Sequence, residues 1–130
     1  MNVAHVLVVD DADHALDLLG YLLRDRGHVA MFARNGEEAV ALALKLRPDL
    51  ILMDLQMPLM DGYEALAAIR GSERARSCPI LALTAFAEVG EREKAQAAGF
   101  DGFFSKPITP ETFMDQLEGF LGGDDRRGAP

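Results

Sequence analysis

The sequence predicts an α/β fold in which a parallel five-stranded sheet is flanked by five helices. Short apolar runs recur along the chain, and each is followed by a longer segment whose apolar residues have helical spacing. This alternation is typical of right-handed βαβ crossovers, which produce a parallel sheet. The run 50–53 is apolar at every position, as expected for a strand buried on both faces. Without a repeat, linker or second pattern, residues 1–121 are predicted to form one domain.

The five strands are predicted from apolar runs that end at polar or turn-forming residues. They are expected at 6–9, 28–33, 50–54, 79–84 and 101–105. The first run is rich in valine, which favours a strand. The second is the weakest of the five, because alanine and methionine are mediocre strand formers.

The five helices are expected at about 12–26, 35–47, 61–70, 89–98 and 109–121. Asn35 and Asp61 each precede a glutamate by three residues, which is the pattern of a capping box. Gly27 is placed to close the first helix in a left-handed conformation. The helix at 89–98 has polar and small residues, so we expect it to be marginal and mobile. Residues 122–130 are expected to form a short, polar, disordered tail.

Composition and charge exclude several classes of protein. The chain is 49% hydrophobic and 26% charged, which is an ordinary globular balance. Its formal net charge of -8 argues against binding nucleic acid or anionic membranes through a basic face. A single cysteine, Cys78, excludes an internal disulfide and favours a reducing cytoplasm. No signal-peptide pattern begins the chain, and no apolar run approaches the roughly 20 residues of a membrane span. We therefore expect a cytoplasmic protein.

Polar side chains with chemical potential follow four of the predicted strands. They are Asp10 and Asp11 after the first strand, Asp54 at the end of the third, Thr84 at the end of the fourth and Lys106 after the fifth. In open α/β sheets, ligands bind beyond the carboxyl ends of the strands. These residues, far apart in the sequence, should therefore meet along one edge of the sheet.

Three carboxylates at one edge need a compensating cation. Two unit charges about 4 Å apart repel each other by several kcal/mol in a partly buried site. Oxygen ligands suit Mg²⁺, and the lack of clustered histidine or cysteine disfavours zinc. Lys106 and Thr84 could hold the oxygens of a phosphoryl group in transfer. Asp54 would then be the nucleophile and would form an aspartyl phosphate.

Over residues 4–121 these motifs resemble a two-component response-regulator receiver domain. The matching elements are Asp10-Asp11, Asp54 within 52–58, Asp61-Gly62, Thr84-Ala85 and Lys106-Pro107. The resemblance implies a flavodoxin-like fold with strand order 2-1-3-4-5. It also implies a phosphorylation-activated signalling switch that receives a phosphoryl group on Asp54 from a histidine kinase or a phosphotransfer domain. Beyond its own phosphorylation and dephosphorylation, no enzymatic turnover is expected.

The resemblance also implies how a metal ion is held. Asp11 and Asp54 would ligate Mg²⁺ (or Mn²⁺) directly. The backbone carbonyl of Gln56 would complete the protein ligands, and Asp10 would act mainly through water.

A conformational switch is implied by the same resemblance. On phosphorylation, Thr84 would move toward the phosphoryl group and Phe103 would rotate inward. The face made by the fifth strand and the helices before and after it would then present a new surface to a partner protein. The Lys106–Pro107 bond is expected to be cis. Gln56 and Phe86 would flank the path of a hydrolytic water, and the bulk of Phe86 would slow dephosphorylation.

Other classes remain open at this point. An aspartate-nucleophile phosphatase generally carries a second aspartate two residues after the first, where this chain has Gln56. A flavin carrier needs a hydroxyl- and glycine-rich phosphate loop, and Asp10-Asp11 would repel that phosphate. A receiver-like binding module that is never phosphorylated normally lacks one of the acidic, threonine or lysine positions.

We expect a stand-alone, monomeric receiver or relay intermediate that acts through protein contacts and dimerises, if at all, on phosphorylation. The alternative is an excised receiver of a larger regulator or hybrid histidine kinase. Neither nucleic acid nor a membrane is expected as a direct partner.

Overall fold

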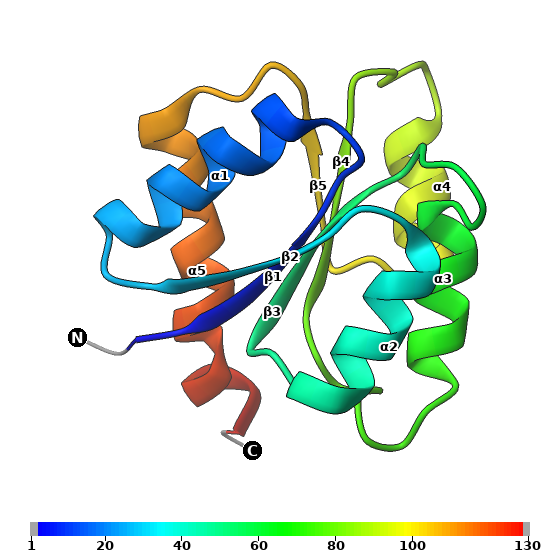
Figure 1. The fold of residues 1–130 in the computed structure, drawn as a ribbon, viewed down its shortest axis with the longest axis horizontal. Coiled ribbons are helices and arrows are strands. Elements are labelled where there is room, and N and C mark those ends of the chain that lie inside the picture. The colour runs from blue at the N-terminus through cyan, green and yellow to red at the C-terminus, as the bar shows by residue number, and fades with distance from the viewer. Residues whose placement is uncertain (1–2, 129–130) are drawn as a thin grey trace.

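Five parallel strands form a single sheet in the order β2-β1-β3-β4-β5 (Figure 1). The structure is a computed structural model that describes residues 3–128, with side chains described for residues 3–121. The strands are β1 (His5–Val9), β2 (Val29–Ala33), β3 (Leu50–Asp54), β4 (Ile80–Thr84) and β5 (Gly102–Ser105). The predicted flavodoxin-like strand order is therefore confirmed.

Helices cover both faces of this sheet. They are α1 (Asp13–Asp25), α2 (Gly36–Leu46), α3 (Gly62–Arg70), α4 (Glu91–Ala98) and α5 (Pro110–Gly128). Helices α1 and α5 lie on one face, and α2, α3 and α4 lie on the other (Figure 1). The helical backbone of α5 includes residues 122–128, so the prediction of a disordered tail is wrong there, because no proline between Pro110 and Gly128 ends the helix. Residues 129–130 of the predicted tail lie outside the described residues. A domain boundary at Leu121 stays a prediction.

A separate hydrophobic core fills the space between the sheet and each helical layer. Successive residues of β3 point to opposite faces. Leu52 packs with α1 and α5, whereas Ile51 and Met53 pack with α2 and α3. All positions of β3 and β4 are buried. This confirms the prediction of a central strand covered on both faces.

Side-chain caps fix where α2 and α3 begin. The Asp61 carboxylate accepts a hydrogen bond from the N–H of Glu64 at 2.9 Å, and the Glu64 carboxylate accepts one from the N–H of Asp61 at 3.0 Å. This is the predicted capping box. Asn35 also caps α2, but the Glu38 carboxylate accepts from the N–H of Arg34 instead of that of Asn35. The prediction of a capping box at Asn35 is therefore wrong in one bond: the Glu38 carboxylate accepts from the residue before the cap.

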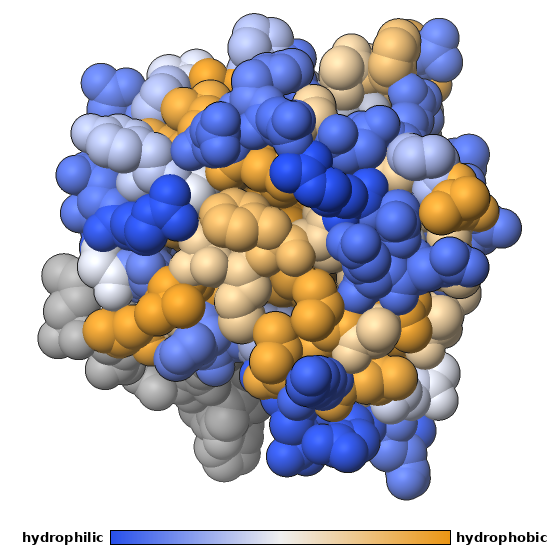
Figure 2. Space-filling view, viewed as in Figure 1, coloured by the Kyte–Doolittle hydropathy of each residue, from blue (hydrophilic) through white to orange (hydrophobic). Residues whose placement is uncertain are grey.

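Strand β2 forms one edge of the sheet and keeps part of its apolar surface exposed. Viewed as in Figure 1, the molecule shows apolar side chains gathered between α1 and α2 (Figure 2). Within β2, the exposed fraction is 40% for Val29 and 37% for Phe32. Gly27, which precedes this strand, has φ +86°, so it closes α1 in the left-handed conformation predicted for it.

Within residues 3–128, no helix combines the length and the apolar character needed to cross a bilayer.

Candidate functional site

The carboxyl ends of four strands bring the predicted site residues together. Asp10 directly follows β1, Asp54 ends β3, Thr84 ends β4 and Lys106 directly follows β5. Because β3 pairs with β4 through Asp54 and Leu83, Thr84 lies one residue beyond the level of Asp54. Asp10, Asp54 and Thr84 are buried, and Lys106 is half-buried. The fold therefore brings these residues together at one edge of the sheet, as predicted.

Three carboxylates form a compact cluster at this edge. One oxygen from each of Asp10, Asp11 and Asp54 lies within 4.8 Å of the other two. Backbone amides orient two of the three: the N–H of Ala12 donates to Asp10 Oδ1 at 3.0 Å, and the N–H of Gln56 donates to Asp54 Oδ1 at 3.1 Å. Asp11 is exposed, so the cluster opens to solvent on its side. A set of carboxylate oxygens at this spacing suits a hard divalent cation such as Mg²⁺.

Lys106 places an ammonium between two buried carboxylates. Its Nζ donates to Asp10 Oδ2 at 2.6 Å and lies 3.8 Å from Asp54 Oδ2. The backbone N–H of Lys106 donates to the Thr84 carbonyl at 2.8 Å, which fixes the loop after β5. The Lys106–Pro107 peptide bond is cis, as predicted. The ammonium offsets part of the repulsion among the acids.

The environment of Asp54 disfavours its charged form. Burial raises the pKa of the Asp54 carboxyl from 3.8 to about 6, and the charges of Asp10 and Asp11 act in the same direction. The amide of Gln56 and the ammonium of Lys106 lower it, but by less than burial raises it. Without a metal ion, the folded protein therefore holds a proton on Asp54 to a higher pH than the unfolded chain does.

Neutralising Asp54 should stabilise the metal-free protein. Above about pH 6, Asp54 is ionised in the folded wild type, and this charge lowers the free energy of unfolding. Below about pH 4, the residue is protonated in both the folded and the unfolded state, so the penalty disappears. Asp54→Asn should therefore raise the free energy of unfolding in EDTA by roughly 2–3 kcal/mol at pH 7. The gain should shrink between about pH 6 and pH 4. Urea unfolding at several pH values checks this, and equal stabilities at pH 7 would contradict it.

Thr84, the last residue of β4, is bonded to Phe86 in the loop that follows the strand. The N–H of Phe86 donates to Thr84 Oγ1 at 3.0 Å, so the hydroxyl oxygen accepts a bond while its own proton stays available to another acceptor. Phe86 is 60% exposed. Phe86 therefore lies two residues beyond the buried threonine and faces solvent.

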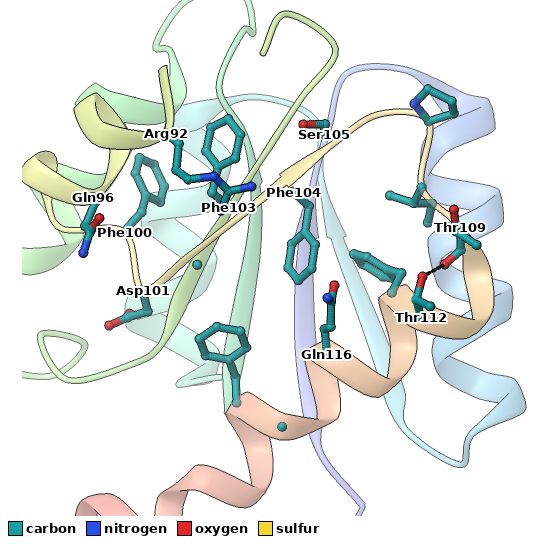
Figure 3. A pocket seen from close by; sticks show the side chains of 16 residues that line it. Arg92, Gln96, Phe100, Asp101, Phe103, Phe104, Ser105, Thr109, Thr112 and Gln116 are labelled. Atoms are coloured by element: carbon teal, nitrogen blue, oxygen red, sulfur yellow. Dashed lines mark hydrogen bonds between the residues drawn. The ribbon is translucent and has the colours of Figure 1, made fainter. Parts of the chain in front are cut away.

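The predicted switch residue Phe103 lies on β5, next to α4. Its partner in the sheet is Ala82 of β4, and the Arg92 guanidinium lies 4.9 Å from the centre of its ring (Figure 3). Phe104 points to the other face and packs edge-on against Phe113, with ring centres 4.9 Å apart. A cavity of about 1160 Å³ extends over α4, β5 and α5, and both phenylalanines line it. The sequence alone does not reveal that Arg92 packs over the ring of Phe103.

A glycine lets α3 begin directly against the end of β3. A Cβ atom on Gly62 would lie 2.5 Å from the backbone carbonyl oxygen of Asp54. The N–H of Gly62 donates to the Leu55 carbonyl at 3.1 Å. This close approach gives a physical reason for the Asp61-Gly62 element of the motif, which sequence reasoning alone does not provide.

The fold and the site together define a flavodoxin-like α/β domain with an acidic cluster around an aspartate at the end of a central strand. Known proteins identify its family. The profile described as "Response regulator receiver domain" matches residues 6–118. The chain belongs to this family of two-component signalling proteins.

Relatives and solved structures agree with this assignment. The chain is 36% identical over 117 residues to the polar-differentiation response regulator DivK of Brucella anthropi, covering 90% of this chain and 95% of the relative. The chemotaxis protein CheY4 of Vibrio cholerae is 34% identical with a TM-score of 0.85, covering 92% of this chain and 99% of that one.

The receiver domain of the sensor histidine kinase PA1611 from Pseudomonas aeruginosa PAO1 is also 34% identical, with a TM-score of 0.85. The match covers 93% of this chain and 99% of that one. That structure has a magnesium ion coordinated in its active site cleft. The present chain is accordingly a receiver-type signalling protein and not a classical enzyme.

Proposed function

We propose that this receiver accepts a phosphoryl group on Asp54 from the phosphohistidine of a histidine kinase or phosphotransfer protein. The observation that carries the proposal is the shared pocket: three clustered carboxylates with the Lys106 ammonium 3.8 Å from Asp54 Oδ2. Such a pocket concentrates charge where a phosphoryl group would need it. The acidic chain with a single cysteine is proposed to act in the cytoplasm.

The acid cluster fits Mg²⁺ or Mn²⁺. Asp11 and Asp54 would hold the ion directly, together with the backbone carbonyl of Gln56, while Asp10 would act through water. When bound, the ion supplies positive charge that neutralises the carboxylates and the phosphoryl oxygens. Asp11 is the exposed member of the cluster, so a hydrated ion arriving from solvent would meet it first.

Three side chains have distinct roles in the phosphoryl transfer. The Asp54 carboxylate attacks phosphorus, so an O–P bond forms as the P–N bond to the donor histidine breaks. The Lys106 ammonium compensates the charge that a phosphoryl group adds beside Asp10 and Asp54. The Thr84 hydroxyl oxygen accepts a hydrogen bond from the N–H of Phe86, and its O–H donates a hydrogen bond to a phosphoryl oxygen.

Acetyl phosphate tests this proposal without knowledge of the natural kinase. With Mg²⁺, the wild type should gain about 80 Da, the mass of one phosphoryl group, and peptide mapping should place it on Asp54. Asp54→Asn should not gain this mass. Asp61→Asn, which changes an acid in the neighbouring cap of α3, is the matched control and should be modified like the wild type. No adduct on the wild type, or an adduct that persists in Asp54→Asn, would contradict the proposal.

The downstream partner is proposed to bind the face made by α4, β5 and α5. Thr84 and Phe103 connect this face to Asp54, because β5 pairs with β4 beside them. The cavity along α4, β5 and α5 gives a partner side chain a place to bind (Figure 3). We propose a monomer in the unphosphorylated state, with dimerisation, where it occurs, following phosphorylation.

Phe86 is proposed to protect the aspartyl phosphate from water. Phe86→Ala removes a bulky ring from the loop directly after Thr84 and should shorten the phosphoryl lifetime roughly two- to fivefold by admitting water. The decay of the mass adduct after removal of acetyl phosphate measures this. Val89→Ala, in the same exposed loop, should leave the lifetime unchanged. An unchanged lifetime in Phe86→Ala would rule out the protective role.

A further inference from the structure

Arg92 of α4 makes a cation–π contact with the ring of Phe103. Its guanidinium lies 4.9 Å from the centre of the Phe103 ring (Figure 3). Within residues 3–121, the Arg92 side chain has no hydrogen bond or ion pair beside this contact. Three other arginines, Arg26, Arg34 and Arg70, are instead paired with carboxylates. The cation–π contact is therefore the interaction that holds the Arg92 side chain in place.

The start of α4 is anchored so that Arg92 reaches β5. Ala95 alone is buried in this short helix of charged residues, glutamine and alanines, so apolar packing contributes little to its position. Instead, the Tyr63 hydroxyl of α3 donates to the Glu91 carboxylate at 2.5 Å, and Lys94 Nζ lies 4.7 Å from the centre of the Tyr63 ring. Arg92 directly follows Glu91, so the same anchor fixes the backbone from which its side chain extends.

We propose that Arg92 holds Phe103 in its unphosphorylated orientation and so opposes activation of the receiver. This inference rests on the proposed function of Asp54 and names a regulator of that same site. Phe103 and Thr84 lie close together on neighbouring strands, since Ala82 pairs with Phe103 and Thr84 with Ser105. The proposed switch turns the ring toward Thr84 and so would take it away from the guanidinium, in which case the contact would favour the orientation seen here.

The size of the effect follows from the strength of the contact. An exposed cation–π pair stabilises the state that contains it by an amount equivalent to about a two- to fivefold change in an equilibrium constant. A ligand that binds the activated conformation has its apparent affinity reduced by the same factor. Removing the guanidinium should therefore tighten the binding of such a ligand roughly two- to fivefold.

Beryllofluoride with Mg²⁺, a stable mimic of the phosphoryl group, provides the test. Fluorine NMR of the bound complex should give a dissociation constant about two- to fivefold lower for Arg92→Gln than for the wild type. Phe103→Ala should remove this difference: in that background, Arg92→Gln should leave the affinity unchanged. An equal affinity of wild type and Arg92→Gln, or a difference that persists without Phe103, would overturn the inference.

Arg74→Gln is the matched control, because it makes the same change of charge at an exposed residue between α3 and β4, outside the contacts of Phe103 and the Tyr63 anchor of α4. It should leave the affinity unchanged or weaken it slightly, since it makes the protein more negative toward an anion. A tightening equal to that of Arg92→Gln would assign the effect to charge and overturn the inference.

The two proposals fail in different ways in this experiment. If the wild type does not bind beryllofluoride, or if Asp54→Asn binds it equally well, the proposed function fails. If the wild type binds it through Asp54 and Arg92→Gln has the same affinity, only the role of Arg92 fails.

Discussion

Lys106→Met will slow the phosphorylation of Asp54 by acetyl phosphate about 100-fold or more. The ammonium is 2.6 Å from Asp10 and 3.8 Å from Asp54, so it compensates charge where a phosphoryl group would be added. Removing one such electrostatic contact from a reaction site typically costs about 10²–10³ in rate. Methionine keeps most of the length of the side chain, so the change removes charge with little loss of volume. The initial rate of adduct formation at saturating Mg²⁺ measures the effect.

The control for this variant is Lys45→Met, which removes an equal charge from the exposed last turn of α2. It should phosphorylate at the wild-type rate. Circular dichroism of both variants should show the wild-type fold. A Lys106→Met protein that is folded and phosphorylates as fast as the wild type would show that Lys106 has no part in the reaction.

Asp11→Asn will raise the Mg²⁺ concentration needed for half-maximal phosphorylation roughly 10- to 100-fold. Asp11 is the exposed carboxylate of the cluster with Asp10 and Asp54, and an amide in its place binds a hard divalent cation less strongly. Excess EDTA should abolish phosphorylation of the wild type, because the repulsion among the acids and the phosphoryl oxygens is then uncompensated.

A second aspartate two residues along the chain gives the matched control. Asp13 lies in the first turn of α1 and pairs with Arg34, outside the cluster. Asp13→Asn should keep the wild-type dependence on Mg²⁺. Equal dependence on Mg²⁺ in wild type and Asp11→Asn, or full activity in EDTA, would remove Asp11 from the proposed metal site.

The parts of the fold predicted from sequence are those set by local patterns. The apolar run 50–53 required burial on both faces, and Asp61 with Glu64 formed the capping box that their spacing indicates. Details set by tertiary context were harder to predict. Glu38 bonds to the amide of Arg34, one residue before the expected position, and that choice depends on the path of the chain before the helix.

The site was predictable because parallel strands carry their carboxyl ends to one edge. Asp10, Asp54 and Lys106 meet for that reason, and sequence order alone suffices to place them. The contact of Arg92 with Phe103 was not predictable in this way. The contact depends on the position of α4, which Tyr63 of α3 fixes through its bond to Glu91. The sequence pattern of α4 gives no sign of this bond.

A crystal structure with Mg²⁺ and beryllofluoride tests the shared pocket most directly. We predict beryllium bonded to Asp54, with Mg²⁺ ligated by Asp11, Asp54 and the Gln56 carbonyl. Lys106 and Thr84 should each contact a fluoride. A metal ion bound without Asp11, or beryllium bonded to any residue other than Asp54, would contradict the account.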